Sequence, residues 1–95
     1  NIGLGVFIGA QTSVCANTIV CEGAIINTGS ILEHDSRVGY FSHLAPGTTI
    51  CDQVDMGDRV LIGSGSTVIP KVCIGCDVEI APGSVIIDDL PAVIK

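Results

Sequence analysis

An aliphatic side chain recurs at every sixth position of the chain, from Ile2 to Ile86. All fifteen positions of this series hold Ile, Val, Leu or Met. A second series, four residues after each member of the first, is small or β-branched everywhere except at Leu90. A period of six fits neither the 3.6-residue period of an α-helix nor a heptad. The register runs without a break from residue 2 to residue 91, so the whole chain is one repeat.

Such a hexapeptide repeat predicts a parallel β-helix, in which each hexad makes one short strand and one turn. Three hexads close a triangular coil of eighteen residues, so fifteen hexads predict about five coils. With strands ~4.8 Å apart, the expected prism is roughly 24 Å tall. The aliphatic residue of each hexad points inward, and the small residue four positions later lets the chain turn the corner. We therefore expect an all-β fold that forms a single domain over residues 1–95.

The composition agrees with strands and excludes some functions. The core residues are mostly β-branched or aliphatic, with no Trp, one Tyr and two Phe. Four Lys and Arg against ten Asp and Glu give a net charge of −6, which argues against nucleic acid as a partner because phosphate binding needs clustered cations. Five cysteines are an odd number, and Cys73–Cys76 is a lone CxxC pair without further ligands. We expect reduced thiols, no metal site and a cytoplasmic protein.

The N-terminal stretch of residues 1–21 has no charged side chain, but it is not expected to enter a membrane. Six polar residues and several glycines interrupt it, and no basic flank precedes an apolar block. The sequence therefore predicts neither a membrane span nor a signal peptide.

Residues eighteen apart lie above one another in a β-helix, so outward positions form columns. Two columns are rich in apolar residues: Phe7, Ile25, His43, Leu61 and Glu79, and Ser13, Ile31, Thr49, Thr67 and Val85. Apolar columns on a surface favour contact between copies of the chain, and a three-sided prism favours a closed cyclic homotrimer. Scattered apolar surface residues would be the simpler interpretation. On the trimer interpretation, His43 lies in or beside a subunit interface.

One turn column is made of small residues: Gly9–Gln11, Asn27–Gly29, Ala45–Gly47, Gly63–Gly65 and Ala81–Gly83. This edge has so little side-chain bulk that a ligand could lie against its backbone. Turn geometry alone also explains each glycine and each proline. Both explanations can hold at once.

The two histidines lie in one polar segment, ILEHDSRVGYFSH, at residues 31–43. His34 takes an outward turn position and Asp35 follows it directly. A carboxylate in this place can hold one imidazole nitrogen and raise the basicity of the other, as a general base requires. The alternative is an ordinary exposed turn histidine beside acids.

The repeat resembles the left-handed parallel β-helix of the hexapeptide acyltransferases over essentially the whole chain. The segments Ile26–Asp35 and Val38–Gly47 are similar to a more specific pattern, N-T-x-S-x-[IV]-E-H-[DE] followed by G-x-[FY]-x-H-[IVL]-[AS]-P-G. This pattern is typical of the sialic acid O-acetyltransferase (NeuD-type) family, which includes bacterial nucleotide-sugar 4-amino N-acetyltransferases of glycan biosynthesis.

The resemblance implies an acetyl-CoA-dependent acetyltransferase that acts on the amine or hydroxyl of a sugar, such as a nucleotide-linked amino sugar or a sialic acid. It implies that His34 is the general base, that Asp35 is its carboxylate partner, and that His43 helps to hold acetyl-CoA or the acceptor at the trimer interface. Coenzyme A would lie alongside Gly47 and Gly65, and a backbone N–H of the small-residue edge would bind the oxyanion. Neither a metal nor a covalent acyl-enzyme is required.

The chain departs from this pattern in three places. Members usually carry an N-terminal Rossmann-like domain, whereas this sequence begins directly in the repeat. Cys51–Gln53 replaces a small Gly-Asn pair. The tail at residues 87–95 is a shortened form of the tail that is usual in the family. Lys71 and Lys95 therefore remain as the candidate lysines to bind the coenzyme's phosphates.

Two rival functions follow from the same fold. A γ-type carbonic anhydrase needs three histidines around zinc, and the chain has two. A non-catalytic trimeric β-helix module, which assembles or presents another domain, stays an alternative.

Overall fold

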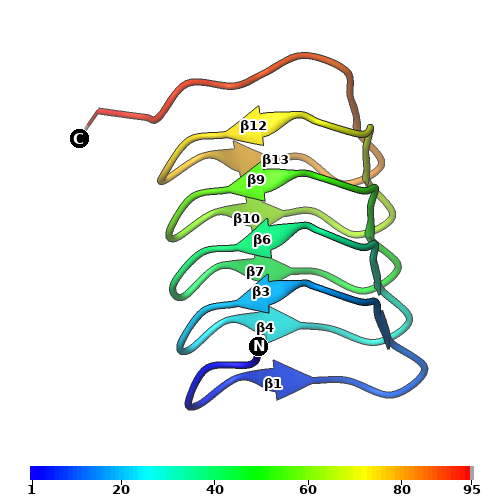
Figure 1. Ribbon diagram of the computed structural model, residues 1–95. Helices are drawn as coiled ribbons and strands as arrows, with labels where there is room; N and C mark the ends of the chain where they lie inside the picture. Colours follow the sequence, from blue (N-terminus) through cyan, green and yellow to red (C-terminus); the bar gives the residue numbers. More distant parts are fainter. Residues whose placement is uncertain (95) are drawn as a thin grey trace.

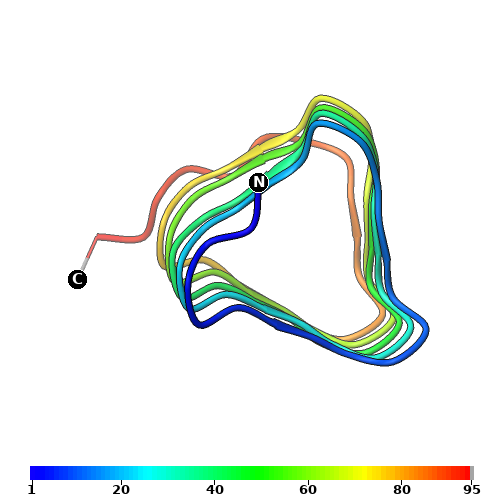
Figure 2. The same cartoon turned by 60° about the horizontal axis from the view of Figure 1, so that its bottom comes forward.

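The computed structural model describes residues 1–94, and within them it has fourteen two-residue β-strands and no helix. The strands form three parallel sheets, which are the three sides of a triangular prism (Figure 1). In Figure 2 the N-terminal end comes toward the viewer, and the chain turns counterclockwise as it recedes. The winding is therefore left-handed, and the expected parallel β-helix is confirmed.

The three faces are named here by one outward residue each. The His43 face contains β1 (Phe7–Ile8), β4 (Ile25–Ile26), β7 (His43–Leu44), β10 (Leu61–Ile62) and β13 (Glu79–Ile80). The Ile31 face contains β2 (Ser13–Val14), β5 (Ile31–Leu32), β8 (Thr49–Ile50), β11 (Thr67–Val68) and β14 (Val85–Ile86). The Arg37 face contains β3 (Ile19–Val20), β6 (Arg37–Val38), β9 (Asp55–Met56) and β12 (Cys73–Ile74).

The pairing register is the one that the period of six predicts. Each strand pairs with the strand eighteen residues later, as Ile25 does with His43 and His43 does with Leu61. The turns therefore stack as well, and they form three corners. The small-residue corner joins the His43 face to the Ile31 face, and the His34 corner joins the Ile31 face to the Arg37 face. The third, the Tyr40 corner, joins the Arg37 face back to the His43 face.

The prism is slightly shorter than the five full coils expected from the sequence. The Arg37 face has four strands instead of five, and its two ends are isolated bridges between Ile2 and Val20 and between Ile74 and Leu90.

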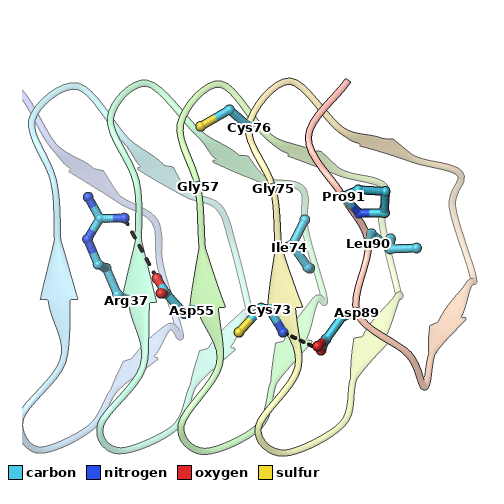
Figure 3. Close-up of a pocket in the computed structure, with 10 residues that line it drawn as sticks. All are labelled: Arg37, Asp55, Gly57, Cys73, Ile74, Gly75, Cys76, Asp89, Leu90 and Pro91. Carbon is cyan, nitrogen blue, oxygen red and sulfur yellow. Dashed lines mark hydrogen bonds and ion pairs between the residues drawn. The ribbon is translucent and has the colours of Figure 1, made fainter. Parts of the chain in front are cut away.

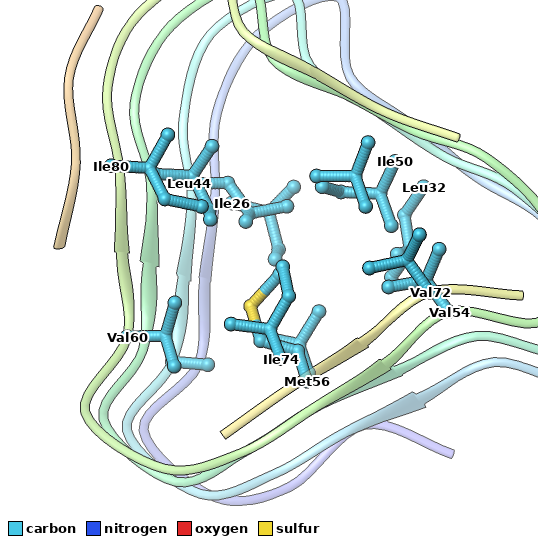
Figure 4. Packing of buried hydrophobic residues seen from close by; sticks show 14 of the residues in the cluster. Ile26, Leu32, Leu44, Ile50, Val54, Met56, Val60, Val72, Ile74 and Ile80 are labelled. Atoms are coloured by element: carbon cyan, nitrogen blue, oxygen red, sulfur yellow. The ribbon is translucent and has the colours of Figure 1, made fainter. Parts of the chain in front are cut away.

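The interior is a dry stack of aliphatic side chains (Figure 4). Ile26, Leu32, Leu44 and Ile50 are fully buried, each between its equivalents in the coils on either side. Burying one such side chain contributes about 1.5–3 kcal/mol. Ile2 and Ile8 belong to the same inward series but are 47% and 41% exposed, because residues 1–94 provide no coil beneath them.

Buried serines connect successive coils at the corners. The Ser42 hydroxyl donates to the Gly57 carbonyl oxygen at 2.9 Å and accepts the Val60 N–H at 3.1 Å, both in the next coil. Ser36 and Ser66 make the equivalent pairs of bonds one corner away. The small residues of the second series therefore do more than leave room for the corner, because their hydroxyls satisfy backbone groups that the sheets leave unpaired.

We predict that Ser42→Ala lowers the free energy of unfolding by about 1–3 kcal/mol, because the buried Val60 N–H loses its acceptor. Ser84→Ala is the matched control. Ser84 occupies the same hexad position, but its hydroxyl bonds only to the Ala81 carbonyl of its own turn. The free energy of unfolding of Ser84→Ala should stay within about 0.5 kcal/mol of the wild-type value. Urea denaturation of both variants measures the difference, and equal losses would contradict the role assigned to Ser42.

Candidate active site

The turn that carries His34 is held from both sides by backbone hydrogen bonds. The Asp35 N–H donates to the Ala16 carbonyl in the coil below at 3.1 Å. The His34 carbonyl accepts the Gln53 N–H of the coil above at 3.1 Å. Asp35 has φ = 61°, a left-handed conformation that Asp tolerates better than most residues. The side chains of His34 and Asp35 therefore project from a rigid backbone although both are exposed to solvent.

His34 and Asp35 form the pair that their adjacency in the sequence suggested. His34 Nδ1 lies 2.8 Å from Asp35 Oδ2, and each side chain is half exposed. An ionised carboxylate can only accept, so the ring donates its Nδ1 proton to it. In the neutral ring Nε2 then carries a lone pair and no proton. This is the tautomer in which a histidine accepts a proton from a substrate.

The surroundings of His34 make it more basic than an ordinary histidine. The hydrogen bond to Asp35 is the largest cause of its raised pKa, and the partial loss of solvent around the ring opposes this effect. The negative charges of Asp52, Asp35 and Glu33 raise the pKa further. All of these groups belong to the His34 corner.

The nearby thiol of Cys51 is not an activated nucleophile. Burial raises its pKa, and the charges of Asp52 and Glu33 raise it further. Since the thiolate is the reactive form, this thiol stays protonated at neutral pH. The His34 corner therefore offers a base beside a cysteine, Cys51, that is not activated.

His43 is oriented by Asn27, a residue to which the sequence analysis assigned no role. Asn27 Oδ1 accepts the Thr28 N–H at 2.8 Å, so the amide NH₂ group points the other way. Asn27 Nδ2 lies 3.4 Å from His43 Nε2, which is therefore the acceptor. The proton of the neutral His43 ring is then on Nδ1. The signal in the sequence was the spacing. Asn27 lies eighteen residues, or one coil, before Ala45, which is two residues after His43.

Gly47 and Gly65 both lie at the small-residue corner, where they adopt φ values of 74° and 72°. A Cβ added to Gly65 would meet no atom within 4 Å, so this edge is open to a ligand. However, the Gly47 N–H donates to the Thr28 carbonyl and the Gly65 N–H donates to the Pro46 carbonyl. These two N–H groups hold the coils together and are not free to bind an oxyanion. Ser64, between them, presents an N–H for which residues 1–94 provide no acceptor.

The predicted site residues fall into two groups on opposite sides of one prism. His43 is on β7, with Asn27, Gly47 and Gly65 at the corner that follows its face. His34 and Asp35 are at the corner between the other two faces, which is the corner opposite the His43 face (Figure 2). A single chain therefore brings His34 to Asp35 and His43 to the small-residue corner, but it does not bring the two groups together.

One hollow within residues 1–94 lies away from both groups. It has a volume of about 520 Å³ and lies between the Arg37 face and the C-terminal segment (Figure 3). Its polar side chains are already paired, since Arg37 lies 3.8 Å from Asp55 and Asp89 Oδ1 accepts the Cys73 N–H at 2.9 Å. None of the predicted site residues lines this hollow.

Two further features of residues 1–94 bear on the kind of site. No group of three or more His, Cys, Asp or Glu side chains is placed to hold a metal ion. No helix long and apolar enough to cross a membrane is found in this part of the chain. Lys95, one of the two candidate phosphate-binding lysines, lies outside the described residues.

No protein-family model matches the sequence, and a search among curated protein sequences finds no significant match. Comparison with solved structures does find relatives. The acetyltransferase domain of PglB from Neisseria gonorrhoeae FA1090 superposes with a TM-score of 0.94 and 30% identity, over 95% of this chain and 44% of that one. PerB from Caulobacter crescentus, solved in complex with CoA and GDP-perosamine, gives a TM-score of 0.88 and 34% identity, over 97% and 49%.

The solved structural neighbours are hexapeptide-repeat sugar acetyltransferases. The PglB domain has also been solved in complex with acetyl coenzyme A, and in that form it shares 26% identity with this chain at a TM-score of 0.85. The chain spans less than half the length of these acetyltransferases. These structures support the general family that the sequence resembles, the hexapeptide-repeat sugar acetyltransferases. The sialic acid O-acetyltransferase type remains a prediction.

We predict that NMR titration finds the His34 ring pKa above the ordinary histidine value of about 6.5, because Asp35 stabilises the protonated ring. Asp35→Asn should lower that pKa, since the amide carries no charge. Asp88→Asn is the control, because Asp88 occupies the same turn position as His34 three coils higher. An unchanged His34 titration in Asp35→Asn would contradict the pairing.

Proposed function

We propose that the chain is the catalytic domain of an acetyl-CoA-dependent acetyltransferase that acts on the amine or hydroxyl of a sugar in bacterial glycan biosynthesis, with a nucleotide-linked sugar as the acceptor. The observation that carries this proposal is the His34–Asp35 hydrogen bond, which leaves His34 Nε2 free as a base at an exposed corner. The solved neighbours support the substrates, because PerB was solved with CoA and GDP-perosamine. A cytoplasmic location belongs to the same proposal.

The reaction that suits this geometry is direct transfer. The acceptor nitrogen or oxygen attacks the thioester carbonyl carbon while His34 Nε2 removes its proton, and the thiolate of coenzyme A leaves. Asp35 stabilises the imidazolium that forms, as a carboxylate partner of a histidine base does. The protonated Cys51 thiol fits a mechanism without a covalent acyl-enzyme.

The division of the site residues supports a homotrimer. His34 and His43 project from opposite sides of a prism, so they can face one common substrate only if they come from different copies. In a closed ring, each copy would give its His34 corner to one neighbour and its His43 face to the other. Each of the three sites would then combine the His34–Asp35 pair of one protomer with the His43–Asn27 pair of the next.

The chemistry of the faces supports the Ile31 face as the one that would point toward the threefold axis of the proposed trimer. The Ile31 face lies between the two groups of site residues, and its outward side chains carry no charge: Ser13, Ile31, Thr49, Thr67 and Val85. The Arg37 face, in contrast, presents the Arg37–Asp55 ion pair. Uncharged and apolar side chains are those that a contact between copies buries. Phe7 and Leu61, which are 55% and 41% exposed, extend the apolar surface on the His43 face.

Coenzyme A is proposed to lie along the small-residue corner, beside Gly47 and Gly65. The corner is free of bulky side chains there, and an added Cβ at Gly65 or Gly83 would meet no neighbouring atom. The unpaired N–H of Ser64 is the donor that we propose for the carbonyl oxygen of the thioester, within the small-residue edge where the sequence suggested a backbone N–H.

The test is the release of free thiol from acetyl-CoA in the presence of GDP-perosamine and a panel of other amino sugars and sialic acids. We predict release by the wild-type chain and a loss of about 10²–10⁴-fold in rate in His34→Ala, which is the usual effect of removing a general base. Asp88→Ala, in the same column of turn residues, should retain full activity.

Two outcomes would contradict the proposal. Undiminished activity in His34→Ala would remove His34 as the base. A folded trimer that releases no thiol with any acceptor would favour the alternative, a non-catalytic β-helix assembly module.

A further inference from the structure

Asp52 lies directly above His34 at the His34 corner. It holds the same turn position one coil later, and the Gln53 N–H donates to the His34 carbonyl at 3.1 Å. The Lys71 N–H in turn donates to the Asp52 carbonyl at 3.0 Å. These bonds fix the two turns on each other with the ordinary spacing between strands, ~4.8 Å. The backbone of Asp52 is therefore as firmly placed as that of His34.

The side chain of Asp52 is also held. Its Oδ2 accepts the Gln53 Nε2 proton at 3.0 Å, so within residues 1–94 the carboxylate has a neutral partner and no cationic one. The charge acts on His34 and raises its pKa. The other titratable groups of this corner include Glu33 and Asp35 in the same turn, Cys15 one coil below, Cys51 one coil above and Lys71 two coils above. Of the carboxylates, Asp35 is already bonded to His34, whereas Asp52 keeps Oδ1 free for a substrate.

We propose that Asp52 is a specificity-determining residue that selects an amine over a hydroxyl as the acetyl acceptor. This inference rests on the proposed function and narrows its substrate class to amino sugars. An amino sugar arrives largely as an ammonium ion at neutral pH, and a carboxylate beside the base attracts that ion and orients its N–H bonds. A hydroxyl acceptor carries no charge and gains only an ordinary hydrogen bond.

The same carboxylate distinguishes the two acceptors during the reaction. The ammonium first gives one proton to solvent, and the free amine then attacks the thioester carbon, while His34 Nε2 stays unprotonated to take the second proton and pass it to the leaving thiolate. The new C–N bond forms with positive charge on nitrogen while the carbonyl oxygen becomes negative. Loss of a second proton from nitrogen, cleavage of the C–S bond and protonation of the thiolate complete the transfer. The positive nitrogen is stabilised by Asp52, whereas an attacking hydroxyl oxygen, from which the base withdraws the proton, gains nothing from a negative neighbour.

The experiment compares kcat/KM for GDP-perosamine with kcat/KM for the matching GDP-sugar that has a hydroxyl in place of the amine. In Asp52→Asn, which keeps the size and the Gln53 contact, the amine-to-hydroxyl ratio should fall about threefold to fivefold, the effect of one exposed charge interaction. The acidic limb of the pH profile should also move to lower pH, since His34 loses a negative neighbour and its pKa falls. Asp52→Glu, which restores the charge, should recover most of the ratio.

Asp88→Asn serves as the matched control and should change neither the ratio nor the pH profile. An unchanged ratio and an unchanged pH profile in an active Asp52→Asn protein would overturn the role of Asp52 and leave the proposed function intact. A wild-type protein that acetylates neither acceptor would overturn the proposed function and, with it, this inference. A wild type that prefers the hydroxyl acceptor would contradict this inference alone.

Discussion

The structure depends on one constraint, the coincidence of a six-residue sequence period with one side of a triangular coil. Because every sixth side chain points inward, the aliphatic series from Ile26 to Ile80 fills the prism without any contribution from the outward positions. Backbone hydrogen bonds between coils then place each turn on the one below. The fold therefore tolerates varied side chains at the outward turn positions, such as the one that His34 occupies, and chemistry can be added there at little cost in stability.

This arrangement explains how exposed residues can form an organised site. In most enzymes a catalytic side chain is held by packing around it, whereas His34 and Asp35 are half exposed. Here the rigidity comes from the backbone bonds of the turn to Ala16 below and Gln53 above. Asn27 gives His43 a comparable support from the side. Each group is well positioned, and in the proposed trimer each would form one half of a site that a second copy completes.

The sequence predicts the fold well because the period is a local rule that repeats fifteen times. It also predicts the His34–Asp35 pair, because the two residues are adjacent in one turn. It does not predict that Asn27 orients His43, since that contact depends on how the Thr28 N–H turns the amide. It also points to the small-residue edge as a source of an oxyanion donor, but it does not tell which N–H groups the hydrogen bonds between coils already use, as they use those of Gly47 and Gly65. The shorter Arg37 face was missed because a repeat pattern carries no information about its own ends.

The central claim is that the catalytic site forms between neighbouring copies of the chain. Mixed trimers test it most directly, by co-expression of His34→Ala and His43→Ala chains with different affinity tags and purification through both. Each variant alone should be inactive, and the mixed trimers should recover part of the wild-type activity, because some interfaces then combine an intact His34 with an intact His43. Mixed trimers that form but stay inactive, or a wild-type chain that is active as a monomer, would contradict the account.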